Sequence, residues 1–214
     1  MADIGIETIK ALKISREELQ KRVAISENEA SKRYFTQQGS SIIMSAHFGN
    51  WEWAEFELGQ AANNQMQVSY LKLNSKYFNA FMKSVRTRFG NHVVDMKYVF
   101  KHAILKNDDA ITTFYLADLN PKQYYEAISF SFLNQSKPFF TGPEKLALRL
   151  GLDVYFAKIV KVRRGYYRID LMLISNKNVA IGTNNITAQY AKMLENSVVE
   201  QPECWAGLFE KQDY

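Results

Sequence analysis

Short apolar runs and amphipathic stretches alternate along most of this chain. Apolar runs of strand length occupy residues 41–46, 66–73, 93–94, 110–117, 154–162 and 166–174. The stretches between them carry apolar residues at helical spacing and predict helices over 50–62, 77–89, 143–150 and 185–199, with another following Asp95. Strands that alternate with helices predict an α/β fold in which a mixed central sheet is flanked by helices.

The two ends of this pattern carry more specific signals. Residues 2–36 are predicted to be helical, because Ser15 and Ser26 are each followed three positions later by a glutamate, the form of a capping box. The strands 154–162 and 166–174 should form a hairpin around Gly165. With 214 residues, 47% hydrophobic composition and no repeat or linker, residues 1–214 are expected to form a single domain.

Composition narrows the cellular setting. No apolar run reaches the length of a bilayer span, and the region after Met1 has no signal-peptide pattern, so we expect neither feature. The single cysteine, Cys204, agrees with a reducing compartment. The chain has 27 basic and 22 acidic residues, so it is mildly cationic. The partner could be an anionic lipid surface, a phosphorylated substrate or nucleic acid, and charge alone does not choose among them.

The most informative chemistry begins at His47. This histidine ends the apolar run 41–46, and the carboxyl ends of strands are where α/β sheets bind their ligands. Glu52 follows on the first turn of the next predicted helix, close enough to orient the imidazole. A histidine held by a carboxylate is suited to act as a general base. A structural histidine tied to a loop carboxylate is an equally good interpretation of this pair taken alone.

Four further segments follow the H-x-x-x-x-E motif of residues 47–52 along the chain. They are Arg86-Thr-Arg88-Phe-Gly90, Tyr115-Leu-Ala-Asp118-Leu-Asn-Pro121, Pro138-Phe-Phe-Thr-Gly-Pro-Glu144 and Gln201-Pro-Glu-Cys-Trp205. Together they resemble the late lipid A acyltransferases, which belong to the glycerolipid acyltransferase superfamily with its H-x-x-x-x-D/E motif. The similarity extends from about Ala2 to Trp205.

This resemblance implies a glycerolipid-acyltransferase-like fold and an O-acyltransferase activity. The expected reaction moves a fatty acyl chain from an acyl carrier protein thioester to a hydroxyl of a lipid A precursor, with His47 as base and Glu52 as its partner. Transfer should be direct, since no G-x-S-x-G elbow is present. The alternatives are another lipid acceptor or a non-catalytic paralogue at the membrane surface. We expect no metal, no cofactor and no nucleic-acid partner.

The resemblance also indicates substrate-binding residues. Arg88, at a helix end, is the preferred candidate for gripping an acceptor phosphate or an oxyanion, while Arg86 is placed on the solvent side. Asp118 should face the His47 cleft. The remaining candidates are Gly49, Asn50, Asn120, Phe140 and Gly142. Each candidate also has a purely structural interpretation. The arginines would be solvated cations at a helix end, Asp118 would cap the end of a strand, and Phe140 would pack in the core.

The expected location is the cytoplasmic face of the bacterial inner membrane, bound peripherally to anionic lipid. Members of the resembled family begin with an apolar anchor helix and end in a basic segment, and neither is found in this sequence. Binding is therefore expected to be weak and electrostatic.

Overall fold

A computed structural model describes residues 2–62, 64–72, 75–105, 110–123, 125–177 and 185–209. In this part of the chain, a seven-stranded sheet has the strand order β1-β9-β8-β2-β5-β3-β4. Its strands are β1 (Val23–Ile25), β2 (Ser41–Ser45), β3 (Gln65–Tyr70), β4 (His92–Asp95), β5 (Ile111–Leu116), β8 (Asp153–Arg163) and β9 (Tyr166–Ser175).

The middle of this sheet is parallel. Strand β2 pairs in parallel with β5 on one side and β8 on the other, and β3 lies between β5 and β4. The predicted β8–β9 hairpin is confirmed as an antiparallel pair, and Gly165 at its turn has a φ of 74°. A second, separate hairpin of β6 (Ala127–Phe132) and β7 (Gln135–Phe140) was not predicted from the sequence.

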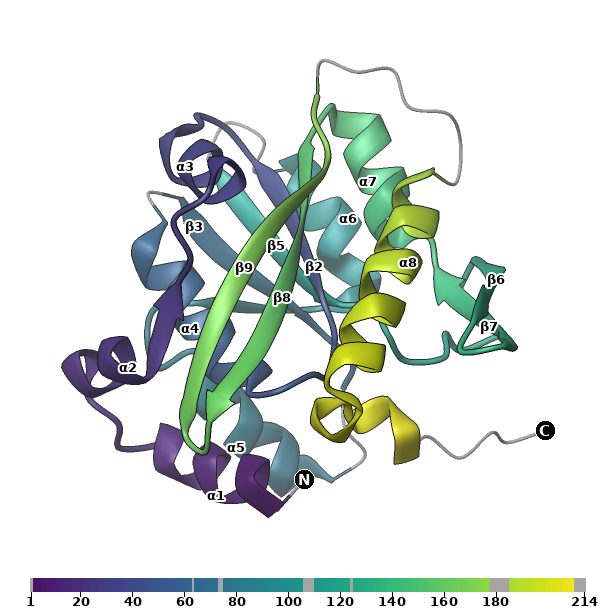
Figure 1. Cartoon of the computed structure of the whole chain (residues 1–214). Coiled ribbons are helices and arrows are strands. Elements are labelled where there is room, and N and C mark those ends of the chain that lie inside the picture. Colours follow the sequence, from purple (N-terminus) through teal and green to yellow (C-terminus); the bar gives the residue numbers. More distant parts are fainter. Residues whose placement is uncertain are drawn as a thin grey trace.

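Helices cover both faces of the sheet (Figure 1). Their bounds are α1 (Ala2–Ala11), α2 (Arg16–Arg22), α3 (Glu29–Thr36), α4 (Trp51–Ala61), α5 (Lys76–Arg86), α6 (Met96–Leu105), α7 (Gly142–Leu150) and α8 (Asn185–Glu200). One core lies between the sheet and α6, α7 and α8. The other lies between the sheet and helices α1 to α5. The prediction of a mixed α/β fold with helices flanking a central sheet is confirmed.

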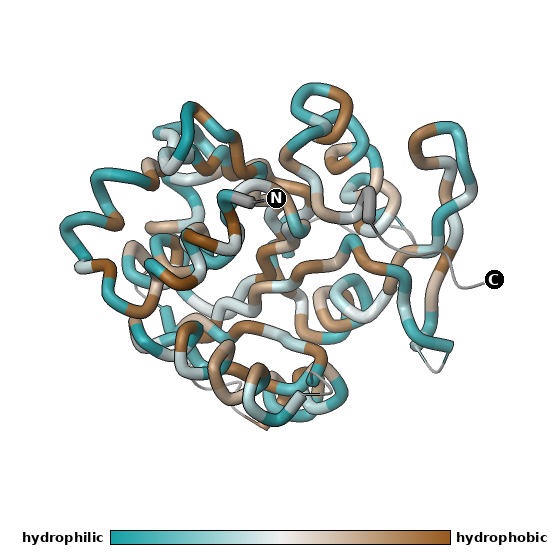
Figure 2. The backbone as a smooth tube through the Cα atoms, turned by 90° about the horizontal axis from the view of Figure 1, so that it is seen from below, coloured by the Kyte–Doolittle hydropathy of each residue, from teal (hydrophilic) through white to brown (hydrophobic). Residues whose placement is uncertain are grey.

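Strand β2 shows why the central strands are apolar throughout. Ile42 and Met44 pack into the core beneath α7 and α8, whereas Ile43 packs into the core beneath α4. A strand buried on both faces needs apolar side chains at odd and even positions alike. Figure 2 shows the contrasting pattern of the outer elements, along which hydrophilic and hydrophobic positions alternate.

The prediction that residues 2–36 are helical was wrong at residues 23–25. Strand β1 interrupts the helices and pairs in parallel with β9, and the Ser26 N–H continues this pairing by donating to the Ile169 carbonyl. The second helical cap therefore shifts from Ser26 to Asn28, whose side chain accepts from the Ser31 N–H at 2.9 Å. The first capping prediction is confirmed, since Ser15 accepts from the Glu18 N–H at 3.1 Å.

Among the described residues, none of the helices combines the length and the apolar character needed to cross a bilayer.

Candidate active site

The site begins where two neighbouring parallel strands end. His47 follows β2 and Asp118 follows β5, and the strand register places Ser45 opposite Leu116. His47 Nδ1 lies 2.8 Å from Asp118 Oδ1, and the His47 backbone N–H donates to Asp118 Oδ2 over 3.1 Å. Two residues separated by 71 positions in the sequence thus form one hydrogen-bonded pair.

A segment near the end of the described chain secures this pair from the other side. The Trp205 indole N–H donates to Asp118 Oδ2 over 2.9 Å. The Ala206 N–H donates to the His47 carbonyl over 2.8 Å, and the Gly49 N–H donates to the Cys204 carbonyl over 2.9 Å. The loop that carries His47 is therefore held at its backbone as well as at its ring.

The surroundings of Asp118 favour its ionised form. Complete burial by itself would raise the pKa of this carboxyl, but His47 and the Trp205 indole together hold it below its ordinary value. A carboxylate can only accept hydrogen bonds, so in the neutral imidazole of His47 the hydrogen is on Nδ1. The basic nitrogen is then Nε2, on a ring that lines a cavity.

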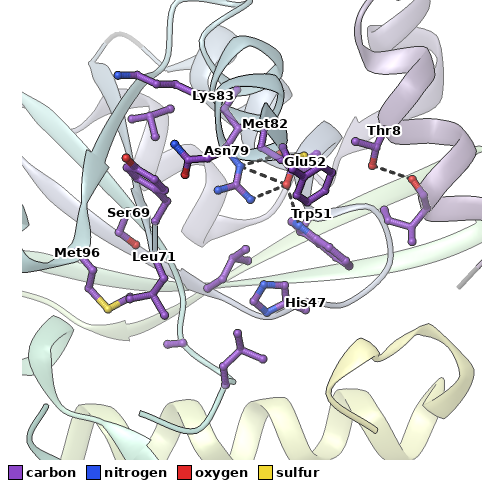
Figure 3. A pocket seen from close by; sticks show the side chains of 18 of the residues that line it. Thr8, His47, Trp51, Glu52, Ser69, Leu71, Asn79, Met82, Lys83 and Met96 are labelled. Carbon is purple, nitrogen blue, oxygen red and sulfur yellow. Dashed lines mark hydrogen bonds and ion pairs between the residues drawn. The ribbon is translucent and has the colours of Figure 1, made fainter. Parts of the chain in front are cut away.

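Glu52 does not pair with His47, so the expectation that it orients the imidazole was wrong. Its carboxylate accepts from Arg86, at 3.0 Å from Nε and 2.6 Å from Nη2, and from the Trp51 indole N–H at 3.1 Å. Glu52 lies on the first turn of α4 and reaches α5, whereas the partner of the histidine comes from the end of β5. Figure 3 shows Trp51 between the two groups, and its ring meets His47 edge-on at a centroid distance of 5.0 Å.

The structure also reverses the expectation for the two arginines. Arg86, placed on the solvent side from the sequence, lines the cavity with a side chain that is only 13% exposed. Arg88, the preferred candidate, donates from Nη1 to the Ala11 carbonyl over 2.8 Å and lies over the Phe89 ring. Helix α5 ends at Arg86, and Arg88 lies in the turn that follows, from which its side chain reaches the end of α1 and not the cavity.

A second carboxyl, Glu55, lies behind the Glu52–Arg86 pair. It is completely buried on α4, and within the described residues neither of its oxygens has a hydrogen-bond partner. Burial raises the pKa of Glu55 well above its ordinary value, the nearby Glu52 raises it further, and Arg86 partly opposes the rise. This environment therefore favours the protonated, neutral form of Glu55. Sequence reasoning overlooked this residue, since an acid at the buried face of a helix has no distinctive motif.

His47 opens onto a cavity of about 520 Å³. Its wall is formed by α1, the first turn of α4, the end of β3, α5 and the loop that follows β5 (Figure 3). Most of the lining side chains are apolar, among them Ile9, Leu71, Phe78, Phe81, Met82 and Phe140. A cavity of this size and character fits a hydrocarbon chain with a few polar groups at one end.

The cavity includes some of the predicted binding residues and omits others. His47, Glu52, Asn120 and Phe140 line it. Asp118 lies behind His47 and is completely buried. Gly49, Asn50, Arg88 and Gly142 are not among the lining residues, so a direct role for them in this cavity does not follow from the structure.

Three of these residues shape the site indirectly. Asn50 caps α4 by accepting from the Trp53 N–H at 3.0 Å, and its amide donates to Glu7 over 2.7 Å. Gly49 has a φ of 58°, in the left-handed region that favours glycine. Gly142 leaves room for the Phe140 ring, because a Cβ at this position would overlap it.

Trp205 is the residue of the site whose role sequence reasoning missed. It stands in the segment Gln201-Pro-Glu-Cys-Trp205, which resembles a family motif, but nothing in the sequence links that segment to Asp118. The link exists because the chain returns after α8 and Trp205 forms a bridge with Phe48 beside the histidine.

A histidine oriented by a buried carboxylate at the end of a parallel strand, facing an apolar cavity, fits an enzyme that acts on a lipid-like substrate. The family model of the bacterial lipid A biosynthesis acyltransferases matches residues 1–211. The chain therefore belongs to this acyltransferase family, as the sequence motifs predicted.

A solved structure is also similar to this chain. The crystal structure of the 1-acyl-sn-glycerophosphate (LPA) acyltransferase PlsC from Thermotoga maritima aligns with 95% of this chain and 83% of its own, with a TM-score of 0.47 and 12% sequence identity. A search of curated protein sequences gave no match.

Proposed function

We propose that this acyltransferase moves a fatty acyl group from an acyl carrier protein thioester to a hydroxyl of a lipid A precursor, without a cofactor. The observation that carries the proposal is the His47–Asp118 pair at the wall of an apolar cavity, in a chain of the lipid A acyltransferase family. Such a cavity suits the acyl chain, and the histidine suits activation of the acceptor hydroxyl.

The chemistry assigns each proton to a named atom. His47 Nε2 takes the proton of the acceptor hydroxyl as its oxygen attacks the thioester carbonyl. The Asp118 carboxylate stabilises the imidazolium that forms. When the tetrahedral intermediate collapses, the C–S bond breaks and the sulfur leaves with the proton from His47. The products are an ester of the acceptor and the free thiol of the carrier.

Glu52 was expected to orient His47, but in this mechanism it positions Arg86. Glu52 accepts from Nε and Nη2 of Arg86 and fixes the guanidinium at the cavity wall. We assign to the remaining Nη1 group of Arg86 the stabilisation of the oxyanion, since a preorganised donor costs no rearrangement during the reaction.

The direct test is transfer between defined substrates. The purified protein, incubated with acyl carrier proteins bearing chains of several lengths and with a lipid A precursor, should yield an acylated precursor detectable by mass spectrometry. His47→Ala should lower the rate by roughly 100- to 10,000-fold. The matched control is His92→Ala, because His92 is an exposed histidine at the start of β4 and does not line the cavity.

The same assay separates the alternatives. Transfer to a different lipid acceptor, with none to the lipid A precursor, would replace the acceptor in this proposal and leave the chemistry intact. Absence of transfer to every acceptor would favour a non-catalytic protein of the membrane surface.

We further propose that the cavity mouth contacts an anionic membrane surface, the cytoplasmic face of the bacterial inner membrane. On α1, Ile6 and Ile9 are 61% and 66% exposed, and on α5 Tyr77 and Phe78 are 91% and 53% exposed. Ile9 and Phe78 also line the cavity, so lipid could pass from the surface into the site. Exposed aliphatic and aromatic side chains on two helices that line one cavity fit the interfacial layer of a bilayer.

Charge supports the same orientation. The acidic side chains of α1 are compensated or covered, since Asp3 pairs with Lys161 and Arg164 and Glu7 is buried. The basic Lys13, which follows this helix, is exposed. Sedimentation with anionic vesicles should therefore exceed sedimentation with neutral ones. Ile9→Glu and Phe78→Glu should each reduce it, and Val199→Glu, at an exposed position on α8, should not. Equal binding of all variants would contradict this orientation.

A further inference from the structure

Helix α1 is attached to the rest of the protein in an unusual way. A surface helix normally buries an apolar stripe against the core. Of the α1 side chains that the structure describes, only Glu7 and Ala11 are buried. The larger apolar side chains Ile4 and Ile9 line the cavity instead, and Ile6 is exposed. Helix α1 is therefore a wall of the cavity whose apolar side chains remain available to a ligand.

Glu7 is the buried attachment of this helix. Its Oε2 atom accepts from the Asn50 amide over 2.7 Å and from the Tyr167 hydroxyl over 2.8 Å. A buried carboxylate is costly unless it is hydrogen-bonded, so α1 can pack here only because these two donors meet it. The ion pairs of Asp3 at the start of α1 are more exposed, and pairs of that kind contribute little to stability.

Glu7 also decides which way the Asn50 amide points. A carboxylate can only accept hydrogen bonds, so the NH₂ group of Asn50 faces Glu7 and its oxygen faces the other way. That oxygen accepts from the Trp53 N–H at 3.0 Å and caps α4. Trp51, the first residue of α4, lines the cavity, and its ring meets His47 edge-on. One carboxylate thus joins the α1 wall to the start of the helix beside the base.

We infer that Glu7 is a positioning residue of this site, which holds α1 in place as the wall against which the hydrocarbon chain of the substrate lies. The inference rests on the proposed acyl transfer and concerns how its acyl chain is bound. Glu7 is not among the residues that line the cavity, so it acts through α1 and Asn50. Without Glu7, the apparent affinity for the chain falls with the fraction of molecules in which α1 is in place.

Two substitutions of Glu7 test this role. In Glu7→Ala both donors lose their acceptor, and KM for the acyl donor should rise roughly 10- to 100-fold. In Glu7→Gln one amide oxygen can still accept from both donors, because both already meet the single atom Oε2. KM of this variant should remain within about 3-fold of the parent. In both variants kcat at saturating donor should change by less than about 3-fold, since the His47–Asp118 pair is intact.

Tyr167→Phe is a milder variant that keeps the aromatic ring and removes one of the two donors. It should raise KM in the same direction by a smaller factor, so it tests the inference even if Glu7→Ala does not fold. Amide hydrogen exchange of α1 should become faster in both variants, because the helix has lost part of its attachment. Exchange and KM equal to those of the parent in both variants would contradict the inference.

The preference among acyl chain lengths is a measurement that simple destabilisation would not change. Ile4, Thr8 and Ile9 line the cavity from α1, so a displaced α1 alters the shape that selects the chain. The ratio of kcat/KM for dodecanoyl and hexadecanoyl donors should change at least about 3-fold in Glu7→Ala, because each buried methylene contributes to selection. The ratio should be that of the parent in Glu7→Gln.

Glu144→Ala is the matched control. Glu144 is also a buried glutamate with two donors, the backbone N–H and the hydroxyl of Thr187. It joins α7 to the start of α8 and is not among the residues that line the cavity. This variant should lower the melting temperature without changing KM or the chain-length preference. If Glu144→Ala shifted both as much as Glu7→Ala does, Glu7 would be an ordinary structural residue.

A binding measurement separates this inference from the reaction itself. Trp51 lines the cavity beside His47, so its fluorescence can report the binding of dodecanoate below its micellar concentration. Dodecanoate should bind to Glu7→Ala about 10-fold or more weakly than to the parent, and to Glu7→Gln about equally well. Such a result without turnover would retain the role of Glu7 and reject the proposed reaction. Turnover with no effect of Glu7→Ala on KM, preference or binding would do the reverse.

Discussion

Asp118→Asn is the substitution that most directly tests the assignment of the base. Asp118 Oδ2 receives two donors, the His47 backbone N–H and the Trp205 indole, while Oδ1 faces His47 Nδ1. An asparagine would place its single oxygen toward the two donors and its NH₂ group toward Nδ1. The imidazole would then have to accept at Nδ1 and carry its hydrogen on Nε2, where it could no longer take a proton from the acceptor hydroxyl.

The size of the effect follows from these contacts. Loss of the base costs roughly 100- to 10,000-fold in rate. That range corresponds to about 3 to 5 kcal/mol in the activation free energy. Stability should fall less, by about 1 to 2 kcal/mol, because both donors to Oδ2 keep an acceptor and lose only its charge. The variant should therefore be a folded protein with a strongly reduced kcat.

The assay compares kcat for acyl transfer in three variants of similar chemistry. Asp118→Asn should be severely impaired. Asp153→Asn is the control for neutralising a buried aspartate, since Asp153 pairs with Arg33 and lies beside the first residue of β2, at the opposite end of this strand from His47. Glu52→Gln should mainly disturb Arg86. If Asp118→Asn retained activity within about 3-fold of the parent while Glu52→Gln lost the base contribution, Glu52 and not Asp118 would have to be the partner of His47.

Three further outcomes follow from the same geometry. Arg86→Lys should lower the free energy of unfolding by about 1 to 3 kcal/mol and reduce transfer at least 10-fold, since an ammonium cannot reproduce the fork to Glu52. Arg88→Lys should change the free energy of unfolding by no more than about 0.5 kcal/mol and should retain activity. Denaturant titration and kcat test both variants, and equal effects would contradict the placing of Arg86, and not Arg88, in the site. Trp205→Phe, which keeps a ring but removes the donor to Asp118, should cost about 1 kcal/mol and lower kcat with little change in KM. Glu55→Gln should flatten the pH dependence of stability, because the pKa of the buried Glu55 is raised in the folded state. As the pH rises from the ordinary glutamate pKa to the raised one, the free energy of unfolding of the parent should fall by about 1.4 kcal/mol per pH unit. That of the glutamine variant should not show this fall. Parallel stability curves from pH 4 to 9 would show that Glu55 is ionised in the fold.

The sequence by itself determined the fold class, most element positions and the place of the histidine. Each of these rests on local pattern: apolar runs mark strands such as β2, helical spacing marks α4, and His47 stands where an apolar run stops. The ordered motifs determined the acyltransferase family in the same way. Two elements were missed, the β6–β7 hairpin and β1. Strand β1 was missed because three residues flanked by helix formers are too short to show a period of two.

Only the tertiary structure decided which carboxylate meets the imidazole. Glu52 was the nearer candidate in sequence, but α4 turns it toward Arg86. Asp118 stands 71 residues away and reaches His47 because β2 and β5 are adjacent parallel strands that end at the same edge. Proximity along a chain predicts contact only within one element. Contacts between elements depend on strand order and helix rotation, which the packing of the whole core sets and no local pattern records.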